Sequence, residues 1–183
     1  SIIRMGLYAS AKQLHGYPIT PGFEIAGIIT HIGSAVTDFQ IGDEVVALTL
    51  FGGYCSHIVL NANRVFHKPA NLTFSQAASM PTVFLTAWFM VREQVMPKAQ
   101  CKVVGVVGSG HKRESALTMG ATEVIDKSSQ NLWQQAQYHS PKGYQAIFDA
   151  NGVSTLKQSY GHLAPMGKLC IYGFASMLPH NGK

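Results

Sequence analysis

The sequence predicts an α/β protein in which a β-rich first part precedes a doubly wound parallel sheet. Up to about Leu72, short intervals rich in Val, Ile and Thr are separated by glycines and prolines, as expected for tightly turned strands. From Cys101 onward, short apolar runs alternate with helical stretches, a rhythm typical of parallel βαβ units. The predicted domains are therefore 1–82 and 83–183.

The expected helices and strands follow from local signals. Thr73 and Gln76 form a capping-box pattern before an Ala-rich helix that should continue to about Val91. The apolar run Lys102–Gly108 predicts a strand buried on both faces. Further strands are expected at Thr122–Ile125, Tyr144–Asp149 and Lys168–Tyr172, and helices at Lys112–Met119, Asn131–His139 and Ser154–Leu163.

Composition excludes several classes of protein. The net charge is +5, but the basic residues are scattered and no run interleaves them with aromatics, so nucleic-acid binding is not expected. The longest apolar run, Val83–Val91, is about half of the roughly 20 residues that a membrane helix needs. Cys55, Cys101 and Cys170 are far apart and form no C-x-x-C, so we expect them reduced and buried in a cytoplasmic protein.

Several motifs in order resemble the medium-chain dehydrogenase/reductase superfamily. The stretch Thr20–Val46 resembles the core of its catalytic domain, and Arg4–Tyr8 resembles the R-x-G-x-Y segment of the quinone oxidoreductase branch. Ser140–Ser176 is similar to the subfamily of the synaptic vesicle membrane protein of the amine-transport type. The resemblance implies a GroES-like catalytic domain, a Rossmann cofactor domain, both incomplete here, and a homodimer.

Phe23 stands at a position that matters for zinc binding. Zinc-dependent members of the superfamily carry Gly-His-Glu where this chain has Gly22-Phe23-Glu24, and a phenyl ring cannot coordinate zinc. The region between Val46 and Phe66 also lacks the four cysteines of a structural zinc site. We therefore predict no metal, and we expect Glu24 to be a carboxylate bonded inside the domain.

Without a Lewis acid, the substrate must accept hydride unaided, as a quinone or an α,β-unsaturated carbonyl does by spreading the developing charge. The resemblance places Tyr8 in the substrate pocket, where its hydroxyl could bind the acceptor oxygen. A half-buried aromatic with its hydroxyl at the surface is an equal alternative for Tyr8.

The cofactor is predicted to be NADPH. An NAD site places an acidic residue at the end of the second strand, but this chain has Val107–Arg113 there, with no carboxylate before Glu114. By resemblance, Ser109 and Lys112 occupy phosphate-contacting positions and Gly108 is a further cofactor-binding position, whereas Arg113 could merely face solvent. Lys127 occupies a position that is usually tyrosine and keeps a phosphate-compatible charge. The remaining cofactor positions implied by the resemblance are Thr86, Asn151 and Gly173, the first and last near the nicotinamide.

One βα unit is missing from the pattern. The family has a first strand, a glycine-rich turn and a helix after Pro97-Lys98, but here Ala99-Gln100 runs directly into Cys101-Lys102, already the second strand. A true deletion would remove the central strand of the sheet, so we favour a segment that belongs between Gln100 and Cys101. Strands before Ser1 and a part after Lys183 are expected as well.

These observations predict a zinc-independent, NADPH-dependent quinone or enone reductase. One alternative is an enoyl thioester reductase of the same superfamily. Another is a vesicle-associated protein whose main role is to bind a partner or lipid, since fold alone does not decide function.

Overall fold

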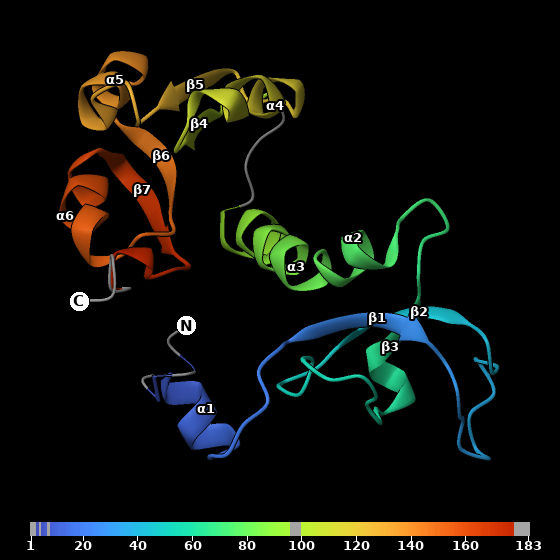
Figure 1. Cartoon of the computed structure of the whole chain (residues 1–183). Helices are drawn as coiled ribbons and strands as arrows, with labels where there is room; N and C mark the ends of the chain where they lie inside the picture. The colour runs from blue at the N-terminus through green and yellow to red at the C-terminus, as the bar shows by residue number, and fades with distance from the viewer. Residues whose placement is uncertain (1–2, 4, 7, 96–99, 178–183) are drawn as a thin grey trace. The chain divides into compact units, whose positions relative to one another are not determined.

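The computed structural model describes residues 3, 5–6, 8–95 and 100–177, and its contacts divide the chain into two compact units, Ser1–Trp88 and Phe89–Lys183 (Figure 1). Arg4 and Pro97-Lys98 of the family motifs lie outside the described residues. The division falls inside a helix, six residues after the predicted boundary at 82/83.

The first unit is built on a three-stranded antiparallel sheet in the order β1-β2-β3. The strands are β1 (Glu24–Ile28), β2 (Glu44–Leu48) and β3 (Val65–His67). The central strand β2 supplies the core, because Val45, Val46 and Ala47 are all buried. Two short helices, α1 (Ala9–Leu14) and η1 (Ala62–Arg64), complete this β-rich part.

A close backbone approach fixes the start of β1. Gly22 has φ +107°, and a Cβ there would lie 2.7 Å from the Cα of Gly53. Only glycine allows both the left-handed backbone and the contact. Phe23, which follows, is held by its carbonyl, which accepts a hydrogen bond of 2.7 Å from the backbone of Thr49.

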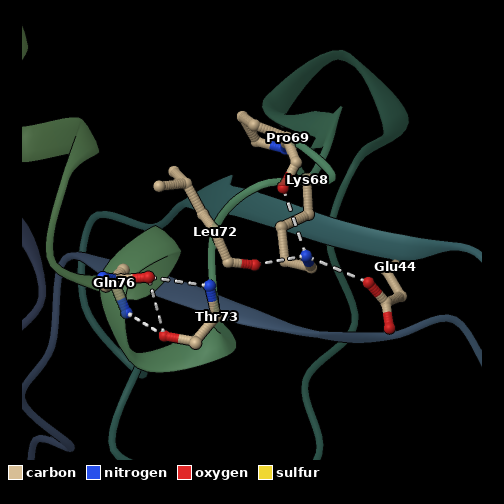
Figure 2. A network of polar contacts seen from close by, with 6 residues as sticks. All are labelled: Glu44, Lys68, Pro69, Leu72, Thr73 and Gln76. Atoms are coloured by element: carbon tan, nitrogen blue, oxygen red, sulfur yellow. Dashed lines mark hydrogen bonds and ion pairs between the residues drawn. The ribbon is translucent and has the colours of Figure 1, made fainter.

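The predicted capping box is confirmed. Thr73 accepts from the backbone of Gln76, and the Gln76 side chain accepts from the backbone of Thr73, at the start of α2 (Phe74–Ala78) (Figure 2). The expected single helix is instead divided, because Pro81 begins a second one, α3 (Pro81–Phe89), and disfavours helical backbone in the residue before it. Six residues of wider π-helical turn, η2 (Met90–Val95), extend it.

A buried lysine supports the approach to α2. The ammonium of Lys68 donates to the carbonyl of Leu72 at 2.6 Å and to that of Pro69 at 3.2 Å, and it pairs with Glu44 at 3.0 Å (Figure 2). The Lys68 side chain is 5% exposed, whereas that of Glu44 is 53% exposed. Lys68 therefore closes the turn after β3 chiefly by satisfying two carbonyls.

The second unit alternates strands and helices as predicted. Its strands are β4 (Val104–Val107), β5 (Glu123–Asp126), β6 (Tyr144–Asp149) and β7 (Leu163–Ile171). Its helices are η3 (Gly110–Lys112), α4 (Arg113–Thr118), α5 (Leu132–His139), α6 (Val153–Gly161) and η4 (Ala175–Met177). All strand pairing here is parallel, β4 with β5 and β6 with β7.

These strands form two separate two-stranded sheets rather than one. The expectation that the strand beginning near Lys102 is buried on both faces is wrong, since Val106 is 51% exposed. The strand itself is present, but within the described residues it has only one strand neighbour.

The predicted burial of the cysteines is also wrong. Cys55 and Cys101 are exposed and Cys170 is half-buried, and all three are free thiols. Cys55 and Cys101 lie in the loops that follow Gly53 and precede β4, so strand packing does not cover them. Within the described part of the chain, no helix combines the length and apolar character needed to cross a membrane.

Candidate functional site

The first group of predicted cofactor residues lies where β4 and β5 end side by side. Val107 and Asp126 are register partners, and the backbone of Lys127 donates to the Val107 carbonyl at 3.0 Å. This pairing puts Lys127 next to Gly108, where an added Cβ would lie 3.7 Å from its Cε atom. Two positions 19 residues apart in the sequence thus form one corner.

The loop after β4 completes that corner. Ser109 is extended and precedes η3, and its carbonyl accepts from the backbone of Lys112 at 3.1 Å. The side chains of Lys112 and Lys127 are exposed. Carboxyl ends of parallel strands are where α/β sheets bind ligands, and two cations at this edge suit an anionic group.

Arg113 does not simply face solvent, as had been considered. Its guanidinium donates to the carbonyl of Val124 in β5, so it ties α4 to the strand. This side chain has a structural task, unlike its neighbour Lys112.

Sequence reasoning missed Asp126 at this corner. An added Cβ on Gly110 would lie 3.3 Å from the Oδ2 atom of Asp126, so a carboxylate reaches the loop from the neighbouring strand. Hydrogen bonds from the Ser128 hydroxyl and backbone, with a contribution from Arg113, hold the pKa of Asp126 below its ordinary value. Asp126 lies at the end of β5, directly beside the end of β4. This neighbourhood follows from the pairing register of the two strands and not from the sequence of either one.

The second group lies at the ends of β6 and β7. Asp149 is buried, and its Oδ1 atom accepts from the backbones of Asn151 and Gly152 at 2.8 and 3.0 Å. Its Oδ2 atom accepts from the hydroxyls of Ser159 at 2.7 Å and Thr155 at 2.8 Å. Burial raises the pKa of Asp149, but these hydrogen bonds outweigh it and leave the pKa below its ordinary value.

The structure brings Asn151 and Gly173 together. An added Cβ on Gly173 would clash with the carbonyl oxygen of Ala150, so only glycine allows the two strand ends to approach. Ser176 fastens the same turn, because its hydroxyl donates to the Asn151 carbonyl at 2.6 Å. No hydrogen bond of the Asn151 side-chain amide is found among the residues that the structure describes, so this amide can serve a ligand.

Tyr8 lies in an aromatic cluster of the first unit. Its ring centroid is 6.3 Å from that of Phe23 and 6.5 Å from that of Phe51, both in edge-on orientation. Phe23 and Phe51 are 5.1 Å apart, and Phe51 is buried. Tyr8 thus contacts the residue that stands where zinc-dependent relatives have a histidine, and its hydroxyl has no hydrogen-bond partner within the described ranges.

The predicted cofactor residue Thr86 lies in α3, and the carboxylate of Glu24 bonds to the same helix. The hydroxyl of Thr86 donates to the carbonyl of Thr82 at 2.7 Å, one turn earlier. The carboxylate of Glu24 accepts from the backbone of Thr82 at 2.6 Å, near the helix N-terminus. Glu24 is therefore bonded inside its unit, as expected, and stabilises the start of α3.

Phe23 stands where zinc-dependent relatives carry a histidine, and a phenyl ring offers no ligand for zinc. The ring of Phe23 packs on Phe51, and among the described residues no three His, Cys, Asp or Glu side chains are grouped to hold a metal.

The first unit also contains an apolar cavity of about 750 Å³ beside β1 and β2. Ile25, Ile29, Phe39, Ile58 and Val65 are among its lining residues. Large apolar pockets are default binding sites, and His31, Cys55 and His57 are among the lining residues, but neither Tyr8 nor Thr86 lines this one.

Two family models cover nearly the whole chain. Residues 2–87 match the alcohol dehydrogenase GroES-like domain, and residues 94–182 match the zinc-binding dehydrogenase domain. The chain belongs to the medium-chain dehydrogenase/reductase family. Its first unit is GroES-like, and its second has the Rossmann-type NAD(P)-binding fold.

Individual members of the family agree with this assignment. The chain is 31% identical to the synaptic vesicle membrane protein VAT-1 homolog of Danio rerio, over 96% of this chain and 40% of that protein. A quinone oxidoreductase structure from Pseudomonas syringae pv. Tomato DC3000 superposes with TM-score 0.82 and 26% identity, covering 96% of this chain and 61% of that one. The Escherichia coli quinone oxidoreductase complexed with NADPH gives 0.79 and 25%, covering 94% and 61%. The chain spans about half the length of the curated relatives it matches.

Proposed function

We propose that the complete protein transfers a hydride from NADPH to a quinone or an α,β-unsaturated carbonyl without zinc. The observation that supports this best is the corner of Gly108, Ser109, Lys112 and Lys127, which gathers two exposed cations at the carboxyl ends of β4 and β5. A 2′-phosphate carries the charge that such a corner suits. The similar Escherichia coli enzyme was solved with NADPH.

The chain's own groups have separate tasks. Lys112 and Lys127 bind the 2′-phosphate, and the loop at Gly108 lets it come close to the backbone. Asn151 and Gly173 flank the strand ends at which the nicotinamide half of the cofactor binds. The family resemblance assigns Thr86 to the same half of the cofactor. When bound, NADPH supplies a hydride from its nicotinamide ring.

Tyr8 is the proposed substrate contact. Its hydroxyl donates a hydrogen bond to the acceptor oxygen, where negative charge develops as the hydride arrives. Bound NADPH would supply the two electrons as a hydride to the β-carbon of an enone, and Tyr8 or water would supply the proton that completes the reduction. The aromatic rings of Phe23 and Phe51 make the surroundings of Tyr8 largely apolar, with the ring of His15 also beside Phe51.

The phosphate assignment is tested with Lys112→Glu. NADPH should bind the variant at least about 10-fold more weakly, because one charge-assisted contact becomes a repulsion, while NADH binding changes little. Lys102→Glu is the matched control, since Lys102 is also exposed but precedes β4 at the opposite end of the strand. Equal losses of NADPH and NADH in the Lys112 variant would refute the phosphate role.

The carboxylate of Asp126 offers the alternative assignment, in which the protein binds NADH. If NADH bound as tightly as NADPH and Asp126→Asn weakened only NADH, the carboxylate beside Gly110 would be the ribose contact and the NADPH assignment would be wrong. Turnover of an enoyl thioester but not of a small quinone would favour the thioester reductase instead. Binding to lipid vesicles with no cofactor binding would favour the non-catalytic role.

A further inference from the structure

The turn that leads from β6 into α6 contains an asparagine followed by a glycine. Of the six asparagines in the sequence, only Asn151 and Asn181 precede a glycine, and Asn181 lies outside the described residues. Asparagine is a chemically labile residue, and it is most labile before glycine, because no side chain keeps the glycine nitrogen away from the asparagine amide. The turn therefore contains a potential site of covalent modification.

The reaction at this site needs no reagent other than water. The backbone nitrogen of Gly152 forms a bond to the Cγ atom of Asn151, and the bond from Cγ to the amide nitrogen breaks. The amide nitrogen leaves as ammonia, with the proton that the backbone nitrogen has given up. Water then opens the five-membered ring at one of its two carbonyls, which leaves either aspartate or isoaspartate and changes no oxidation state.

The fold does not allow a less reactive residue at position 152. Gly152 has φ +76°, and an added Cβ would lie 2.9 Å from the Cδ1 atom of Phe174 and 3.2 Å from the carbonyl oxygen of Gly173. Both the left-handed backbone and these contacts select glycine. Protection of Asn151 must therefore come from the bonds around it and not from a bulkier neighbour.

Hydrogen bonds hold both ends of the peptide group that would react. The backbone N–H of Gly152 donates to the Oδ1 atom of Asp149 at 3.0 Å, and Asp149 is only 4% exposed. The carbonyl of Asn151 accepts from the hydroxyl of Ser176 at 2.6 Å and from its backbone N–H at 3.0 Å. Attack requires the Gly152 nitrogen to lose its proton and the peptide group to rotate. Both movements break these bonds, so the turn must open first.

We propose that Asn151 is a site of spontaneous deamidation that Asp149 and Ser176 hold unreactive, and that its modification irreversibly loosens this turn. Isoaspartate adds one carbon to the main chain before Gly152, so the bonds to Asp149 and Ser176 can no longer form together. Aspartate instead puts a second carboxylate two residues after Asp149, where the two negative charges repel. The inference rests on bonds inside the second unit and not on the proposed function, so failure to bind NADPH would leave it unaffected.

A synthetic peptide provides the unprotected reference rate. Trypsin cleaves after Lys142 and Lys157, and the peptide Gly143–Lys157 that it releases contains Asn151 as its only asparagine. The complete protein and the synthetic peptide would be incubated at the same neutral pH and temperature, and isoaspartate and aspartate measured by liquid chromatography and mass spectrometry. An unaged sample, digested in parallel, corrects for reaction during digestion.

The folded protein should deamidate at Asn151 at least about 10-fold more slowly than the peptide, because every 1.4 kcal/mol or so needed to open the turn slows the reaction tenfold. Isoaspartate should nevertheless accumulate at Asn151 on prolonged incubation. Equal rates in the protein and the peptide would overturn the protection by Asp149 and Ser176.

Two serine variants of the complete protein test whether this turn controls the rate. Ser176→Ala removes the 2.6 Å bond to the Asn151 carbonyl and the acceptor of the Ser154 backbone N–H, so deamidation should become about 2- to 10-fold faster. Ser140→Ala is the matched control, since its hydroxyl donates to the carbonyl of Gly143 at 2.6 Å at the other end of β6. This variant should leave the rate at Asn151 unchanged. An unchanged rate in Ser176→Ala, or an equal increase in both variants, would overturn the inference.

Discussion

Replacement of Asp149 by alanine should strongly destabilise the second unit. The carboxylate is 4% exposed and accepts hydrogen bonds from two backbone amides and two hydroxyls. Alanine leaves the backbone amide of Gly152 and the hydroxyl of Ser159, both in buried bonds, without an acceptor. Thr155 is less affected, because it also reaches the Gly152 carbonyl at 3.2 Å.

The expected loss of stability follows from the two donors that lose their acceptor, the Gly152 amide and the Ser159 hydroxyl. A buried group that loses a charged partner costs about 1.5–3 kcal/mol, so the free energy of unfolding should fall by about 3 kcal/mol. That is a large share of the roughly 5–15 kcal/mol by which domains are stable. Asp149→Asn is the matched control: its amide oxygen still accepts from the backbone, and the Ser159 hydroxyl can rotate to accept, so we expect a loss of about 1 kcal/mol.

The pH dependence has a definite sign. Because the pKa of Asp149 is lowered in the folded state, its ionised form contributes stability above the unfolded pKa of about 3.9. That contribution is lost as the pH falls through the lower folded value. The difference between the wild type and Asp149→Ala should therefore be full at pH 7 and shrink below about pH 3.9.

Urea unfolding of the complete protein measures these values. Trp133 stacks on His162 with ring centroids 5.1 Å apart, so its fluorescence reports on the second unit. A Trp88→Phe background removes the other tryptophan of these 183 residues, which belongs to the first unit. A loss below about 1 kcal/mol at pH 7, or one that grows on acidification, would refute the account of this carboxylate.

Three further substitutions test other parts of the structure by urea unfolding. Lys68→Met should lower the free energy of unfolding by about 2 kcal/mol, because two carbonyls lose their donor. Glu44→Gln should lower it by less than about 1 kcal/mol, because that carboxylate is half-exposed. Equal losses in the two variants would show that the ion pair dominates. Met166→Gly should raise the free energy of unfolding by roughly 0.5–1 kcal/mol, since Met166 is exposed and has φ 63°. Met119→Gly, at an exposed position with φ −82°, should lower it. A change of the same sign in both variants would contradict backbone strain at Met166. Gly173→Ala should disrupt the approach of the chain after β7 to the end of β6 and lower the melting temperature or abolish cofactor binding, and a variant with wild-type melting and NADPH affinity would contradict the close contact.

Local signals in the sequence were sufficient for most elements of the fold. Thr73 and Gln76 marked a helix start, and the run at Tyr144–Asp149 gave a strand with the same bounds as in the structure. The division at Pro81 was missed because apolar residues continue on both sides of the proline. The exposure of Val106 was missed because burial depends on neighbouring strands, which a single segment does not report.

The site was predictable only in part for the same reason. Motifs picked out Lys112 and Lys127, but their common corner depends on the register of β4 and β5. Asp126 was overlooked because it reaches Gly110 from the next strand rather than along the chain. The task of Arg113 likewise became visible only from its bond to Val124. Pairing across strands is long-range information, and short patterns do not contain it.

Transfer of an isotopic label tests the central claim most directly. The complete protein would be mixed with NADPH deuterated at the transferable position of the nicotinamide ring, an α,β-unsaturated ketone and a metal chelator, and the product examined by mass spectrometry and NMR. Direct hydride transfer without zinc predicts one deuterium at the β-carbon of the saturated ketone, at a rate that the chelator does not change. Consumption of NADPH with no deuterium at that carbon, or loss of turnover in the chelator, would contradict it.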